Sequence, residues 1–314
     1  MIRLSFIVPF YNVEPYIEEC IRSLYAQDIP QEEYEVICVD DCSPDGSRAI
    51  VERLQKEYPT LKLLIHTENK RQGGARNTGM KVAQGKYIWF VDSDDYIKPN
   101  CLKLLLQQAE CEDLDILKFY YKQYPKHKFN QWKCTSSVVS GTELIFDIDT
   151  GEKAIVKCCT VWSQLIKKDL IVMNKIKFAE NVQYEDDDYA YQLYAYAKRV
   201  RLISEEAYIN RQTPNSTTRR KNDYRRANDM YAQALRMVNL YPNLQTIDAR
   251  WGKLVKQSIS NTLYTIFWIL SDCKLIEQLH WFVRRKSIRC FRPFISRRMY
   301  MQLSSYLFWK LTYK

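Results

Sequence analysis

Hydrophobic positions in the first hundred residues follow two spacings. Short apolar runs at 4–9, 34–39, 61–66 and 86–91 predict buried strands. The segments between them predict helices over 16–26, from the turn at 43–46 to about residue 58, and over 73–82. In the first of these helices, apolar side chains recur every three or four positions, as at Ile17, Cys20, Ile21 and Leu24. This alternation predicts an α/β fold, a mostly parallel sheet with helices on both faces.

The pattern is less regular from residue 101 onward. We expect a helix over 101–110, strands near 116–121 and 136–139, and helical structure over 160–200. Beyond about residue 222 the chain reads as helical, basic and aromatic, and a loop signal at 213–220 separates it from the rest. The expected domains are therefore 1–218, with halves 1–100 and 101–218, and a helical extension, 219–314.

Composition indicates a globular protein. Hydrophobic residues make up 46% of the chain and charged residues 27%. The apolar run at the N-terminus is too short for a signal peptide, and the longest run elsewhere, at 263–270, is far below the roughly 18 residues of a spanning helix. The ten cysteines show no paired CxxC spacing, which favours reduced thiols and argues against zinc. We expect a cytoplasmic protein, soluble or peripheral on the membrane.

Positive charge is concentrated at the C-terminal end. The net charge is +10, and residues 281–314 hold nine Lys or Arg and no Asp or Glu. Because the rest is nearly neutral, a general nucleic-acid-binding surface is disfavoured. Aromatic residues alternate with the basic ones over 276–314, a composition typical of helices on anionic membrane surfaces. Packing on the first domain and nucleic-acid binding remain the alternatives for this segment.

Acidic side chains follow two of the predicted strands. Asp40 and Asp41 end the second strand, and the fourth runs into Asp92, Ser93, Asp94 and Asp95. Ligands bind at the carboxyl ends of strands in open α/β sheets. Closely spaced carboxylates repel one another unless a cation lies among them, and a hard cation such as Mg²⁺ commonly brings a phosphate. A polar turn is the alternative interpretation of residues 92–95.

A glycine-rich segment lies between the two acidic strand ends. Gly73 and Gly74 would let the backbone approach a ligand closely, and the helix that follows has an N-terminus suited to an anion. Arg76 is a planar, permanently charged partner for phosphate. The alternative is a glycine turn with a solvated arginine. The fingerprints G-x-G-x-x-G and G-x-x-x-x-G-K-[ST] are absent from the start of the chain.

Four blocks in order, residues 5–12, 39–47, 73–79 and 85–95, resemble the N-terminal half of family 2 glycosyltransferases. Fainter similarity continues through 161–165, 184–189 and 208–216, so that the resemblance covers roughly residues 3–218. It implies the GT-A nucleotide-sugar-binding fold and an inverting transferase of polysaccharide or capsule type. A phosphatase of the haloacid dehalogenase type fits less well, because the first strand ends in Pro9 and not in Asp.

The resemblance also assigns roles to individual residues. Pro9 and Tyr11 match positions that line the nucleobase pocket, and Asp41 matches the acid that binds the base, a role that Asp40 could share. The remaining matches are Gly74 and Arg76 near the nucleotide, Asp92 and Ser93 in the donor site, and Asp94 as the firmer metal ligand beside Asp92.

The acceptor side of the reaction is expected at the acidic run 184–189. Asp186 matches the catalytic base, because Tyr189 falls where the family prefers an aromatic residue, and Glu185 is the alternative base. The resemblance implies transfer from a nucleoside-diphosphate sugar, with UDP favoured, to a glycan or lipid-linked acceptor, with Mn²⁺ or Mg²⁺ as the cofactor. A non-catalytic nucleotide-sugar-binding or scaffold protein on the same fold is the competing function.

Overall fold

A computed structural model describes residues 1–125, 134–146, 160–213, 224–272 and 288–294. The chain divides into two compact units, 1–217 and 218–314. The first unit holds one eight-stranded sheet in the order β3-β2-β1-β4-β7-β6-β8-β5. Four of these strands are parallel neighbours, namely β3 (Leu61–Ile65), β2 (Tyr34–Asp40), β1 (Leu4–Phe10) and β4 (Tyr87–Phe90). The predicted α/β fold is confirmed.

The sheet continues beyond β4 with mixed directions. The strand β7 (Gln164–Lys167) runs antiparallel to β4 and to β6 (Ile116–Tyr124). The strand β8 (Val200–Arg211) is parallel to β6 and pairs with the short β5 (Tyr96–Ile97). Because β5 follows residues 92–95 directly, its pairing with β8 brings residues 208–211 to the acidic end of β4.

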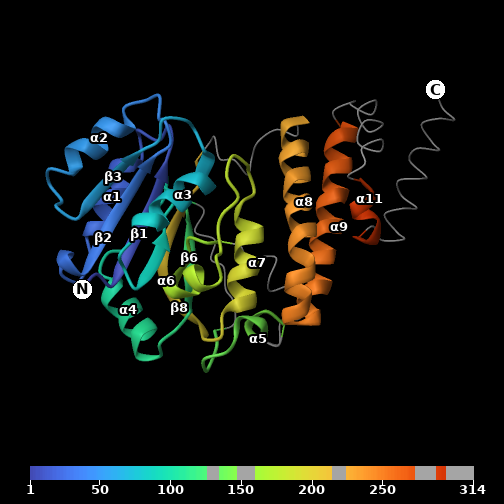
Figure 1. The fold of residues 1–314 in the computed structure, drawn as a ribbon. Coiled ribbons are helices and arrows are strands. Elements are labelled where there is room, and N and C mark those ends of the chain that lie inside the picture. Colours follow the sequence, from blue (N-terminus) through green and yellow to red (C-terminus); the bar gives the residue numbers. More distant parts are fainter. Residues whose placement is uncertain (126–133, 147–159, 214–223, 273–287, 295–314) are drawn as a thin grey trace. The chain divides into compact units, whose positions relative to one another are not determined.

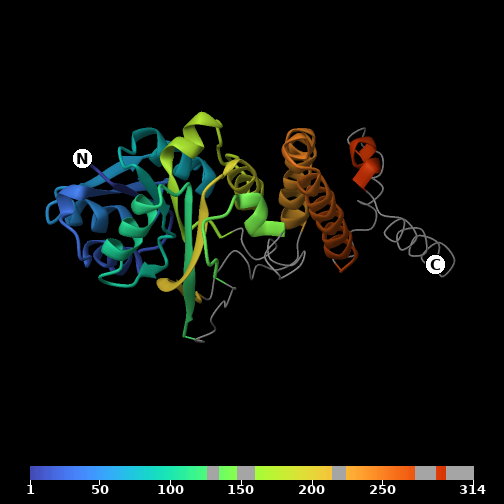
Figure 2. The same ribbon diagram turned by 90° about the horizontal axis from the view of Figure 1, so that it is seen from below.

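Helices cover both faces of the sheet (Figures 1 and 2). One face of β1, with Leu4, Phe6 and Val8, shares a buried apolar cluster with residues of α1 (Ile17–Tyr25), α2 (Ser47–Leu54) and α4 (Leu102–Cys111). On the other face α3 (Arg71–Val82) lies so close that a Cβ on Gly79 would come 2.5 Å from Ile7 Cγ2. Strands buried on both faces explain why β1 and β2 read as continuous apolar runs.

Two sequence predictions in the second half of this unit were wrong. Residues 160–200 are not helical throughout, because they form β7, then α6 (Lys168–Met173), then an irregular segment, then α7 (Asp186–Tyr196). Residues 136–139 form only a single bridge, between Val139 and Val200. A short α5 (Gly141–Phe146) follows this bridge. In the first half of the unit, α2 ends at Leu54, earlier than the predicted end near residue 58.

The second unit contains two long helices, α8 (Tyr224–Ile247) and α9 (Ala249–Asp272), which pack side by side. A short turn of helix, α11 (Ile288–Phe291), and the 3-10 turn Arg292–Phe294 follow. Most of the basic and aromatic segment 276–314 lies outside the described residues. No helix in the described part of the chain is long and apolar enough to span a membrane.

Candidate active site

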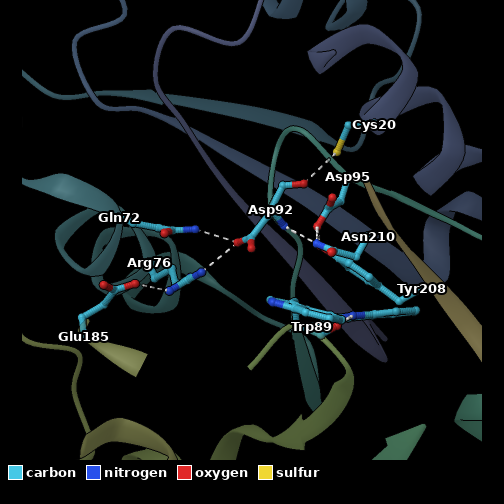
Figure 3. Close-up of polar contacts among 10 residues, drawn as sticks. Cys20, Gln72, Arg76, Trp89, Asp92, Asp95, Glu185, Tyr208 and Asn210 are labelled. Carbon is cyan, nitrogen blue, oxygen red and sulfur yellow. Dashed lines mark hydrogen bonds and ion pairs between the residues drawn. The ribbon is translucent and has the colours of Figure 1, made fainter. Parts of the chain in front are cut away.

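The loop after β4 is held by the far end of the sheet. The carboxylate of Asp95 is buried and accepts hydrogen bonds from Tyr208 Oη at 2.7 Å, Asn210 Nδ2 at 3.1 Å and the backbone N–H of Arg211 at 2.7 Å (Figure 3). Tyr208 Oη in turn accepts a bond from the N–H of Asp92 at 3.1 Å. These contacts fix the turn so that Asp92 and Asp94 keep their positions.

Asp94 sits in a more open place than Asp95. Its Oδ2 accepts a hydrogen bond from Thr213 Oγ1 at 3.3 Å, and its carbonyl accepts one from Arg211 Nε at 3.0 Å. Burial, with repulsion by Asp92, raises the pKa of Asp94 to about 6. A carboxylate whose charge is disfavoured in this way gains most from a nearby cation.

Arg76 joins the acidic loop to the start of α7. Its guanidinium donates to Asp92 Oδ1 at 2.8 Å and to Glu185 Oε1 at 2.7 Å (Figure 3). The Arg76 side chain is only 3% exposed, and its guanidinium carbon lies 5.1 Å from the centre of the Phe178 ring. Asp92 Oδ1 also accepts from Gln72 Nε2 at 2.6 Å. Both terminal nitrogens of Arg76 are thus bound to carboxylates, and its predicted place near the nucleotide stays a prediction.

The helix α3 clamps the irregular segment that leads to α7. Asn77 donates to the carbonyl of Phe178 at 2.9 Å and accepts from its N–H at 3.0 Å. The Phe178 ring stacks on Tyr189 of α7 at a centroid distance of 3.6 Å. Gly73 brings the backbone of α3 against this segment, since a Cβ there would lie 2.2 Å from the carbonyl oxygen of Ala179. A Cβ on Gly74 would likewise come close to the side chain of Lys70, so both glycines allow close packing within the protein. Their predicted approach to a ligand stays a prediction.

Gly73→Ala is expected to destabilise the first unit by roughly 1–3 kcal/mol, because the backbone oxygen of Ala179 cannot move aside cheaply. Gly46→Ala is the matched control. Its added Cβ would meet only the carboxylate end of Glu14, a flexible side chain. Chemical denaturation measures both. Equal free energies of unfolding for the two variants would show that α3 does not pack tightly on this segment.

Asp186 is the first residue of α7, and Glu185 precedes it as the N-cap. Burial, followed by repulsion from Asp187 and Glu185, raises the pKa of Asp186 well above that of an ordinary aspartate, although Arg76 opposes this rise. Asp187 and Asp188 occupy the first turn, where the helix dipole favours negative charge. Glu185 is paired with Arg76, whereas no ion pair of Asp186 is found in the part of the chain that the structure describes. The choice between these two acids as the base stays a prediction.

The predicted nucleobase residues lie at the ends of β1 and β2. Asp41 is buried and accepts at Oδ1 from His66 Nδ1 at 2.7 Å and from the N–H of Lys70 at 2.8 Å. Its Oδ2 has no partner among the described residues. Pro9 is buried in β1, whereas Tyr11 is 49% exposed.

Asp40 differs from Asp41 in its surroundings. It is fully buried, and its two oxygens accept from Arg48 Nε at 2.6 Å and from the N–H of Ser43 at 2.8 Å. These bonds shape the turn after β2. Both oxygens of Asp40 are therefore already engaged, and the predicted role of either acid in binding the base stays a prediction.

The residues after β4 suit a divalent cation bound together with a ligand. Asp92 Oδ2 and Asp94 Oδ1 have no hydrogen-bond partners among the described residues. Ser93, the residue between them in the sequence, is buried. No group of three or more His, Cys, Asp or Glu in the described residues is arranged to hold a metal alone. Two carboxylates leave coordination positions for phosphate oxygens and water, as Mg²⁺ and similar ions prefer.

Comparison with known proteins gives the family. Residues 5–168 match the model of glycosyl transferase family 2. The chain belongs to this family. Glycosyltransferase EpsJ of Bacillus subtilis, described as uncharacterized, is 34% identical over 219 residues, which are 68% of this chain and 62% of EpsJ. The poly(ribitol-phosphate) beta-N-acetylglucosaminyltransferase TarS of Staphylococcus aureus is 29% identical over 214 residues. These residues make up 66% of the present chain but only 35% of TarS.

Solved structures agree with the fold of this family 2 chain. A structure of S. aureus TarS 1-349 with UDP-GlcNAc has a TM-score of 0.66 and 26% identity, and it covers 83% of this chain and 72% of that one. A mannosyltransferase from Pyrobaculum calidifontis, solved with GDP-Man and Mn²⁺, covers 98% of this chain and 85% of its own, with a TM-score of 0.56. At 18% identity this second likeness concerns the fold alone.

The sequence alone did not reveal the contacts that organise the site. Gln72, Asn77, Phe178 and Tyr208 carry no recognisable catalytic signature, and each acts through a partner distant in the chain. For Gln72, Asn77 and Tyr208 the available signal was their position inside or next to the family blocks 73–79 and 208–216, whereas Phe178 lies outside all of the matched segments.

Proposed function

We propose that this chain is an inverting, metal-dependent glycosyltransferase that moves a hexose or N-acetylhexosamine from a UDP-sugar to a hydroxyl group of a glycan or lipid-linked acceptor. The observation that carries the proposal is the pairing of Arg76 with both Asp92 and Glu185, at 2.8 and 2.7 Å. It joins the acids after β4 and the acids that begin α7 in one site. Membership of family 2 and the UDP-GlcNAc in the similar TarS structure support the donor class.

The residues divide the work between donor and acceptor. Asp41 Oδ2 accepts the N3–H of uracil, and the exposed ring of Tyr11 covers the base. Asp94 and Asp92 would hold Mn²⁺ or Mg²⁺, which when bound would supply positive charge to neutralise the leaving diphosphate. Asp186 accepts the proton of the acceptor hydroxyl as that oxygen attacks the anomeric carbon. A single attack from the face opposite the diphosphate inverts the anomeric centre.

Two further assignments follow from the relatives. Poly(ribitol-phosphate) transferases of Staphylococcus aureus and Bacillus spizizenii are among them, at 29% and 32% identity, which supports an acceptor in surface-polymer synthesis. An acceptor of that kind would bring the protein to the cytoplasmic face of the membrane. Release of UDP from UDP-N-acetylglucosamine in the presence of Mn²⁺ tests the proposal, because a scaffold would bind the donor without turnover.

The rate is expected to fall as the pH is lowered, with a midpoint above the ordinary aspartate pKa of about 3.9. The reason is that a general base works only when deprotonated, and burial raises the pKa of Asp186. A pH profile of kcat/KM for UDP release measures the midpoint. The residual rate of Asp186→Asn should lose this acid limb. A profile that stays flat to about pH 4 would contradict the assignment.

A further inference from the structure

Arg76 forms an ion pair with only one of the two predicted bases at the start of α7. Glu185 is paired at 2.7 Å and its side chain is 9% exposed, whereas no ion pair of Asp186 is found among the described residues. Arg76 comes from α3, 109 positions earlier in the chain than Glu185. A buried ion pair over this separation fixes one element against another, provided that the arginine itself is held.

Arg76 is held on several sides. Its guanidinium lies 5.1 Å from the Phe178 ring centre and 6.0 Å from that of Phe90, and the second ion pair ties it to Asp92. The N–H donors of a planar guanidinium have a fixed geometry, so little conformational entropy is lost when the group bridges two carboxylates. Movement of Glu185 away from Arg76 would leave the buried Glu185 carboxylate without its ion-pair partner, which is costly.

We propose that Arg76 is a positioning residue, which keeps Glu185 in an ion pair so that Asp186 is the acid left to take the acceptor proton. The same arginine sets the distance between that base and the donor-binding Asp92. This inference rests on the proposed function, since it presumes that Asp186 is the base. It assigns Arg76 to the geometry of the acceptor side and not to direct contact with a phosphate.

The proposal predicts shifts of opposite sign in the acid limb of the pH profile. The charged groups that shift the pKa of Asp186 most are Asp187 and Glu185, which raise it, and Arg76 of α3, which lowers it. Glu185→Gln removes a negative neighbour and should move the limb to lower pH, whereas Arg76→Gln removes the positive neighbour and should move it to higher pH. One unit charge several ångströms away corresponds to about one pH unit. The double variant should return close to the parent profile.

The experiment measures UDP release from UDP-N-acetylglucosamine with Mn²⁺ between about pH 4 and 9. Glu57→Gln is the matched control, because Glu57 also pairs with an arginine, Arg22, but is exposed and lies in the turn after α2. Its profile should be unchanged. Thermal unfolding checks that each variant folds. If Arg76→Gln does not fold, the shift of the acid limb in Glu185→Gln tests the proposal by itself. Coincident profiles for Glu185→Gln and the parent would overturn the proposal.

A second measurement needs no donor. Carbodiimide couples amines to protonated carboxyl groups, so mass spectrometry of labelled peptides follows the pH at which Asp186 gains its proton. The midpoint should move in the same two directions in Glu185→Gln and Arg76→Gln. The assignment of Asp186 as the base and the positioning role of Arg76 can be refuted separately. A fully active Asp186→Asn would refute the assigned base, whereas an inactive Asp186→Asn with unmoved midpoints would refute only the role of Arg76.

Discussion

Asp186→Asn is expected to lower UDP release from UDP-N-acetylglucosamine by about 10²–10⁴-fold while leaving UDP binding unchanged. The amide keeps the size of the carboxylate but cannot accept a proton from the acceptor hydroxyl. Donor binding should survive, because the proposed donor residues Asp41, Asp92 and Asp94 lie on other elements. Steady-state release of UDP and calorimetric titration with UDP and Mn²⁺ measure the two effects.

Asp187→Asn is the control for this experiment, since it removes the next acid of the same helix turn. It should keep most of the turnover at neutral pH. Glu185→Gln should also stay active, because Glu185 is engaged by Arg76. Near-normal turnover in Asp186→Asn together with loss in Glu185→Gln would move the base to Glu185.

Asp94→Asn is expected to reduce UDP release by at least about a hundredfold and to abolish the dependence of UDP affinity on Mn²⁺. Asp94 is the acid after β4 that is partly exposed and whose ionised form is destabilised, since its pKa is raised to about 6. It should therefore gain the most from the cation. An amide oxygen is a weaker ligand and supplies no negative charge.

The control for Asp94 is Asp113→Asn, an exposed acid that pairs with Lys167 away from the site. Its UDP affinity and turnover should match those of the parent protein. Titration with UDP in Mn²⁺ and in EDTA separates metal-dependent from metal-independent binding. Full Mn²⁺-dependent affinity in Asp94→Asn, with loss in Asp92→Asn, would make Asp92 the principal ligand.

Local patterns in the sequence predicted the first half of the sheet well. The runs that became β1, β2 and β4 are buried along their whole length, whereas the edge strand β3 is mostly half-exposed. Acids stand at the ends of β2 and β4. Prediction failed where a strand was short or half-polar. The four residues of β7 include the fully buried Gln164, which is bonded to Tyr194 at 2.7 Å, and β8 carries Glu205 and Glu206 in its middle.

The sequence predicted candidate site residues but not the contacts between them. Asp41, Asp94 and Asp186 were identifiable from family blocks, whereas the roles of Arg76, Gly73 and Asp95 depend on contacts with Glu185, Ala179 and Tyr208. Each of these contacts spans more than a hundred residues. Such pairings arise from the order of strands in the sheet, which no local spacing encodes. The sequence therefore gave no sign that Arg76 is a buried bridge between two carboxylates.

Turnover by the unaltered protein tests the central claim most directly. The protein is incubated with UDP-N-acetylglucosamine and other UDP-sugars in the presence of Mn²⁺, and free UDP is measured against a parallel sample in EDTA. The account predicts UDP release from at least one donor, with loss of release in EDTA. Binding of UDP-sugars without release of UDP from any of them, in either condition, would contradict an enzymatic role and favour the scaffold function.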